Sequence, residues 1–203
     1  MSEKNTIIET FGIAPSTNII DVLANSGYSL ETAIADIIDN SISAGADSIS
    51  ISYRFNNDED DYVLITDNGK GMTLDELKEA AILANISKNE KREEFDLGRY
   101  SLGLKSASMS FCDRLYLSSK VENGEINTIC MDFDHIRNNG KWEASVVDHD
   151  LLEKNAKNGT AVLWKKLKLY DKNSFDRNQI NRKLYSLQEH LGHTFSDFIC
   201  MKC

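Results

Sequence analysis

The spacing of apolar side chains predicts several amphipathic helices along the chain. Across residues 30–44 the leucine and isoleucine side chains fall on one side, which is the period of a helix with one buried face. Ser29 is a suitable N-cap for this helix, and Gly45 is a suitable residue to end it. A capping box at residues 73–76 opens a later helix. The expected helices span residues 17–26, 30–44, 73–84, 103–111 and 176–191.

Alternation of apolar and polar residues predicts strands between and after these helices. Ile49, Ile51 and Tyr53 alternate with polar residues, as in a half-buried strand. Asn123-Gly124 is a strong signal for a hairpin between two later strands. The expected strands span residues 49–55, 62–66, 113–121, 125–133, 142–147 and 159–167. Helices followed by consecutive antiparallel strands indicate an α+β fold, with helices on one face of a mixed sheet.

Two short segments carry the chemistry of a nucleotide site. Asp36 and Asn40 are one helical turn apart, so a carboxylate and a carboxamide face the same way. Asp67 ends an apolar strand and is followed at once by Gly69 and Gly71. A G-x-x-x-x-G-K-[ST] phosphate loop does not occur in the sequence, so any nucleotide site here is not of that common kind.

Together with two later segments, these residues resemble the GHKL ATPases, which include gyrase B subunits, heat-shock chaperones, histidine-kinase catalytic domains and MutL. The similarity is greatest to the Morc-like branch and its bacterial relatives. The segments that resemble family motifs are Ala33–Ser41, Asp67–Gly71, Gly98–Ser106 and Gly159-Thr160, in family order. The resemblance implies a two-layer α/β sandwich with helices on one face of a mostly antiparallel sheet.

The resemblance also implies a role for each motif residue. Asn40 would bind Mg²⁺, and Asp36 stands where hydrolysing relatives carry a general base, normally Glu. Asp67 would accept a hydrogen bond from the adenine amino group, with Thr160 in support. A plain turn is the alternative reading of Asp67. The nucleotide contacts implied in this way are Asn40, Asp67, Gly69, Gly71, Met72, Gly98, Arg99, Gly103, Leu104, Lys105, Ser106 and Thr160.

The segment Gly98–Ser106 would hold the phosphates. Gly103 is expected to open a helix, whose N-terminus favours anions, and Lys105 adds a positive charge there. Many relatives have glycine where this chain has Ser101. Arg99 either reaches phosphate or is a solvated side chain. Residues 85–102 are charged and lack a steady period, so we expect them to form a lid over ATP.

Three functions remain open from the sequence. The first is a slow, Mg²⁺-dependent ATPase that acts as a conformational or dimerisation switch in a larger protein. The second is a nucleotide-sensing module without significant hydrolysis, because Asp36 is one methylene shorter than the usual Glu. The third is a histidine-kinase-type catalytic domain, although no segment resembles a phosphoacceptor helix.

The composition narrows the partners and the location. A net charge of −9 argues against direct duplex binding, so DNA is expected only indirectly or through other domains. No apolar run approaches the ~18 residues of a membrane span, and the start lacks a signal-peptide pattern, which makes the cytoplasm the expected location. We expect an ATP-dependent homodimer of the full-length protein, by resemblance.

The end of the chain leaves two questions. We expect one ATP-binding domain over residues 1 to about 195, followed by the beginning of a further segment at about 195–203. The spacing of His190, His193, Cys200 and Cys203 is compatible with zinc. A terminal helix that carries the histidines, followed by a frayed end, is the favoured alternative.

Overall fold

The computed structural model describes residues 16–25, 27, 29–56, 59–82, 100–168 and 199–202, with backbone only at 100–102 and 199–202. The helices are α1 (Ile19–Ala24), α2 (Leu30–Ser43), α3 (Leu74–Ala81), α4 (Tyr100–Phe111) and α5 (Phe133–Asn139). The strands are β1 (Ile49–Arg54), β2 (Tyr62–Asp67), β3 (Cys112–Lys120), β4 (Asn127–Asp132), β5 (Ser145–Val147), β6 (Gly159–Leu167) and β7 (Ile199–Lys202). The helix expected at 176–191 lies outside the described residues.

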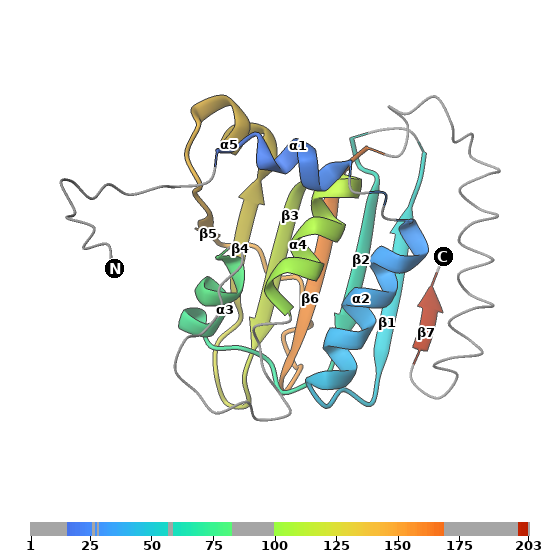
Figure 1. Cartoon of the computed structure of the whole chain (residues 1–203). Helices are drawn as coiled ribbons and strands as arrows, with labels where there is room; N and C mark the ends of the chain where they lie inside the picture. The colour runs from blue at the N-terminus through green and yellow to red at the C-terminus, as the bar shows by residue number, and fades with distance from the viewer. Residues whose placement is uncertain are drawn as a thin grey trace, which may run out of the picture.

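The strands form one mixed sheet with the order β5-β4-β3-β6-β2-β1-β7. Every pairing is antiparallel except that of β7 with β1, which is parallel. Figure 1 shows α2, α3 and α4 side by side in front of the sheet, with α1 crossing near one end of α4. The expected α+β sandwich, with helices on one face of a mostly antiparallel sheet, is therefore confirmed. None of the described helices is long and apolar enough to cross a membrane.

Helix α2 forms because its sequence supplies both a cap and a buried stripe. The Ser29 side chain accepts a hydrogen bond from the backbone N–H of Thr32 at 3.1 Å, as the sequence predicts. The buried stripe consists of Leu30, Ala33, Ile34, Ile37, Ile38 and Ser41. Asp36 and Asn40 lie beside this stripe and are half-buried, and Asp36 faces α4.

Helix α4 begins earlier than the sequence analysis expects. Its first residue is Tyr100, so Gly103 lies in the first turn instead of opening the helix. The reason is local, because residues 100–102 contain neither glycine nor proline and extend the helix backward without strain. The backbone of residues 100–102 therefore belongs to α4, and the rest of the expected lid, 85–99, lies outside the described residues.

Helix α5 differs from the sequence prediction, because the alternating pattern predicts one strand through residue 133. The strand ends at Asp132, whose side chain accepts from the backbone N–H of His135 at 3.1 Å and so caps α5. Gly140 ends the helix in a left-handed conformation, with φ of 67°. The apolar residues Phe133 and Ile136 then turn into the core at helical spacing.

Strand β5 is also shorter than expected and begins at Ser145 rather than at 142.

Candidate nucleotide-binding site

Asp67, at the end of β2, is held by hydrogen bonds from three parts of the chain. Its Oδ2 accepts from the hydroxyl of Ser41 at 2.7 Å. Its Oδ1 accepts from the backbone N–H of Gly69 at 2.9 Å and of Thr160 at 3.1 Å. Burial raises the pKa of the Asp67 carboxyl, and these three hydrogen bonds act in the opposite direction. The carboxylate is thus fixed in orientation at the place where α2, β2 and β6 meet.

A second polar cluster lies beside Asp67, at the ends of β3 and β6. Ser119 is fully buried, and its hydroxyl donates to the carbonyl of Gly159 at 3.0 Å. The same hydroxyl oxygen accepts from the backbone N–H of Met72 at 2.8 Å and lies 3.0 Å from the hydroxyl of Thr160. Met72 and Thr160 are therefore both held by the hydroxyl group of Ser119. Both were predicted from the sequence to contact nucleotide.

Two glycines near this cluster are required by the close approach of backbone to backbone. At Gly71, with φ of 70°, an added Cβ would lie 1.9 Å from the carbonyl oxygen of Lys120. At Gly159, with φ of 143°, it would lie 2.1 Å from the carbonyl oxygen of Asp67. Both positions therefore exclude any side chain. The atoms that exclude a side chain here are protein carbonyl oxygens, and they explain both glycines without a ligand. The role of Gly71 beside adenine therefore stays a prediction.

Asp36 lies against the first turn of α4, and Asn40 follows it one turn later on α2. A Cβ placed on Gly103 would be 3.5 Å from Oδ2 of Asp36, which shows how closely the two helices approach. Among the described residues, neither side chain has a hydrogen-bond or ion-pair partner. Partial burial, and after it the charge of Asp36, raises the pKa of neighbouring Asp39. A half-buried carboxylate and carboxamide are therefore available beside the start of a helix.

Lys105 does not face this side of α4. Two residues along a helix turn the direction of the side chain by about 200° relative to Gly103. The Lys105 side chain is fully buried, and its ammonium donates to the carbonyl oxygen of Ile82, just beyond α3. Burial lowers the pKa of Lys105 to about 8. In this structure Lys105 is therefore separated from Asp36 by the body of α4.

The remaining predicted residues fall into two groups. Leu104 packs against the hydrophobic core, and the hydroxyl of Ser106 donates to the carbonyl of Gly103 at 3.2 Å. Gly98 and Arg99 lie outside the described residues, and their predicted contacts stay predictions. The sequence analysis includes Ser41 only as the end of the motif segment Ala33–Ser41 and does not single out Ser119. The only signal for either was a polar residue at a core position.

The donors near Asp36 suit Mg²⁺ only as part of a complex with nucleotide. Among the described residues, no group of three or more His, Cys, Asp or Glu side chains converges on a metal site. Mg²⁺ needs few protein ligands when it keeps waters and takes phosphate oxygens, so one carboxamide oxygen from Asn40 fits it. The side chains of the zinc candidates His190, His193, Cys200 and Cys203 lie outside the part of the chain that is described.

Comparison with known proteins agrees with this geometry. Residues 28–161 match the sequence model of a family described as Histidine kinase-, DNA gyrase B-, and HSP90-like ATPase. The matched segment is more than half of the 203-residue chain and includes Asp36, Asn40, Asp67 and Thr160. No curated protein matches the sequence.

Proposed function

Because this chain belongs to the histidine kinase-, DNA gyrase B- and HSP90-like ATPase family, we propose that it binds ATP with Mg²⁺ and hydrolyses it slowly. The observation that carries the proposal is the fixed, half-buried carboxylate of Asp67, together with Asp36 and Asn40, whose side chains have no partner among the described residues. The Asp67 carboxylate has the chemistry to recognise a nucleotide base, and Asp36 and Asn40 have the chemistry to act on phosphate.

Asp67 supports selection of adenine. Each carboxylate oxygen has two lone pairs, and Oδ2 accepts only one described protein hydrogen bond, that of Ser41. The remaining lone pair suits the exocyclic amino group of adenine. Guanine presents a carbonyl oxygen at the corresponding position, which a carboxylate repels. The raised pKa of Asp67 reflects the burial that makes such a hydrogen bond strong.

Asp36 is proposed to orient the water that attacks the γ-phosphate. Its unpaired carboxylate and its place beside the first turn of α4 support this role, since helix N-termini favour phosphate. Asn40 would hold Mg²⁺, which offsets phosphate charge when it is bound. Asp is shorter than the Glu of hydrolysing relatives, and misplacement of a reacting group by about 1 Å can cost ~10²-fold in rate. Slow turnover follows.

The other nucleotide contacts are part of the same proposal. Gly69 and Thr160 donate to Asp67, and Met72 and Thr160 both contact the hydroxyl of Ser119. Gly71 approaches the carbonyl of Gly159, the neighbour of Thr160, so these contacts support a common site. Gly98, Arg99, Gly103, Leu104 and Ser106 are assigned to the phosphate side by resemblance. Lys105 would have to leave the carbonyl of Ile82 before it could contact a phosphate.

The biological use of the site is proposed from resemblance. We expect ATP binding to act as a switch for dimerisation in a larger, Morc-like or MutL-like protein, with any contact to DNA made elsewhere. A nucleotide sensor without significant hydrolysis is the second candidate, and the short Asp36 side chain favours it. The two candidates differ in whether phosphate is released.

Phosphate release with variants of α2 tests the proposal. The 203-residue chain should bind ATP yet turn over below about one per second, at the low end of ordinary enzymes. Asp36→Ala should abolish release while ATP affinity changes only a few-fold, because a water-orienting group acts mainly in the transition state. Asp36→Glu restores the usual length and should preserve or raise the rate.

Asp39→Ala is the matched control, since Asp39 is an exposed carboxylate on the same helix. It should leave phosphate release within about twofold of wild type. Equal release from wild type and Asp36→Ala would remove Asp36 from the mechanism. ATP binding without any release by wild type would favour the sensor.

A further inference from the structure

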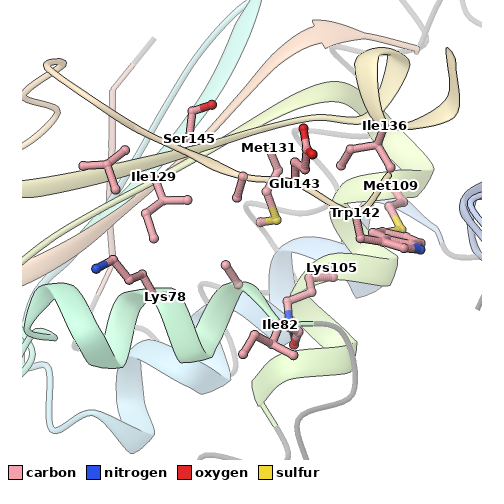
Figure 2. A pocket seen from close by; sticks show the side chains of 13 residues that line it. Lys78, Ile82, Lys105, Met109, Ile129, Met131, Ile136, Trp142, Glu143 and Ser145 are labelled. Carbon is pink, nitrogen blue, oxygen red and sulfur yellow. Dashed lines mark hydrogen bonds between the residues drawn. The ribbon is translucent and has the colours of Figure 1, made fainter. Parts of the chain in front are cut away.

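A cavity lies on the opposite side of α4 from Asp36. Its volume is about 580 Å³, within the range of small-molecule sites. It is bounded by α3, α4 and β4 and by the chain that follows α5, as Figure 2 shows. The apolar side chains that line it include Ile82, Met109, Ile129, Met131, Ile136 and Trp142.

The cavity contains one fully buried cation. Lys105 lines the wall from α4 and is 0% exposed. Its ammonium has three donors, of which one reaches the carbonyl of Ile82. Among the described residues, no carboxylate lies within ion-pair distance of it. Within the described part of the chain, its other two N–H groups therefore have no partner, and an unpaired donor in an apolar cavity is costly.

The other charged residues that line the cavity do not neutralise the charge of Lys105. Lys78 pairs with Asp75 at 3.6 Å, and its side chain is 53% exposed, which places it at the solvent edge. Glu143 also lines the cavity but is exposed, and it makes no ion pair with Lys105. The unsatisfied positive charge is thus inside the cavity, and the rim is of mixed charge.

We propose that this cavity binds an aliphatic monocarboxylate, with the carboxylate on Lys105 and the hydrocarbon chain among the apolar side chains. A carboxylate supplies two acceptor oxygens, which match the two free N–H groups. The unbranched side chains of Met109 and Met131 adapt to a flexible chain. A phosphate dianion fits less well, because the two remaining N–H groups of one ammonium are too few donors for it, and the Ile82 carbonyl beside them is an acceptor. The proposal does not depend on nucleotide binding.

Titration of the nucleotide-free chain with dodecanoate tests the site, with dodecanol as the matched neutral probe. Calorimetry should show one molecule bound per chain, with dodecanoate at least tenfold tighter than dodecanol. Lys105→Met keeps the length of the side chain and removes the charge, so it should weaken dodecanoate at least tenfold and leave dodecanol unchanged. Lys154→Met alters an exposed lysine outside the cavity and should change neither.

A variant that fills the cavity provides a second test of the proposed site. Ala81 lines the cavity from α3, and Ala81→Phe should weaken both probes at least tenfold while the thermal melt stays cooperative. Dodecanoate that binds Lys105→Met as tightly as wild type would overturn the proposal. So would equal affinity for the two probes, no binding at all, or binding that only ATP displaces and that Lys105→Met leaves unchanged.

Discussion

At the scale of single residues, the same side-chain type has opposite roles according to its partners. Asp67 is saturated on one oxygen by two backbone N–H groups, whereas Asp36 has no partner among the described residues. A saturated carboxylate is suited to recognition because it cannot move, and an unpaired one is suited to act on water. Lys105 is the reverse case, a charge buried away from any described anion.

Asp67→Asn should separate recognition from folding. The amide oxygen can take the place of Oδ1, which accepts from Gly69 and Thr160, and the amide NH₂ then faces Ser41. The Ser41 hydroxyl can accept from it, because it has the carbonyl of Ile37 as an acceptor of its own at 3.3 Å. The fold is therefore retained, but a donor faces the adenine amino group.

We expect Asp67→Asn to weaken ATP by roughly ten- to hundredfold, from a cost of about 1–3 kcal/mol for an unpaired buried donor. Calorimetry with ATP and GTP measures it, and wild type should prefer ATP. Asp75→Asn, at an almost fully exposed carboxylate, is the control. Unchanged ATP affinity in Asp67→Asn, or equal binding of ATP and GTP by wild type, would contradict the assignment.

The free energy of unfolding should depend on the charge of Lys105. Burial lowers its folded-state pKa to about 8 from 10.5. Below about pH 8 the folded chain carries the full cost of the buried charge. As pH rises toward 10.5 the unfolded chain binds more protons than the folded one, so stability increases.

Lys105→Met should therefore be more stable than wild type at pH 7, by up to about 3 kcal/mol. The difference should shrink as pH approaches 10. Urea unfolding of both proteins at pH 7 and pH 10 measures this. A difference that is constant with pH would show that Lys105 does not titrate in this window.

At the scale of elements, the contact between α2 and α4 brings the proposed catalytic residue to a helix end. The N–H groups of the first turn of a helix have no intrahelical partner, so this end attracts anions. Gly103 in that turn keeps the space beside Asp36 open. Gly71 differs from Gly103, because a side chain at Gly71 would clash with the protein backbone, whereas one at Gly103 would only fill the space beside Asp36.

Gly103→Ala should leave the fold intact and reduce ATP turnover. The new Cβ would make only an ordinary 3.5 Å contact with Asp36, and alanine favours the helix by up to about 1 kcal/mol. It would, however, occupy space where phosphate and water are expected. Gly71→Ala is the contrasting variant, because its Cβ would clash with the carbonyl of Lys120, at a cost of about 2 kcal/mol or more.

Thermal melts and phosphate release distinguish the two variants. Gly103→Ala should melt at or above the wild-type temperature with lower turnover, and Gly71→Ala should melt well below it. Wild-type turnover in Gly103→Ala would show that the space beside Asp36 is not used.

At the scale of the whole molecule, nucleotide binding should couple to stability. The proposed site draws residues from α2, α4, β2 and β6, so ATP should favour the folded chain over the unfolded one. At a free ATP concentration of about 100 times Kd the stabilisation is about 2.7 kcal/mol, or about 5–10 °C in melting temperature.

A thermal melt with Mg²⁺ and ATP, compared with ATP plus EDTA and with GTP plus Mg²⁺, measures this coupling. The shift should be largest with Mg²⁺ and ATP and should fall in Asn40→Ala. An equal shift with EDTA would contradict the role of Asn40 as a Mg²⁺ ligand.

The sequence by itself determined the elements and the positions of the motifs, because both are local. Caps such as Ser29, the buried stripe of α2 and the Asp67–Gly71 turn depend on residues a few positions apart. Helix α5 was missed for the same reason: a short amphipathic turn after a strand resembles a continuation of that strand, and only the cap at Asp132 marks the change.

Only the tertiary structure decided which side chains share a site. Ser41 and Thr160 reach Asp67 from 26 and 93 residues away, and Ser119 joins Met72 from 47 residues away. Such pairs are set by sheet order and helix packing, which no local pattern encodes. The direction of Lys105 was decided in the same way. The contact of α4 with the end of α3 turns this side chain into the cavity between these helices and away from Asp36.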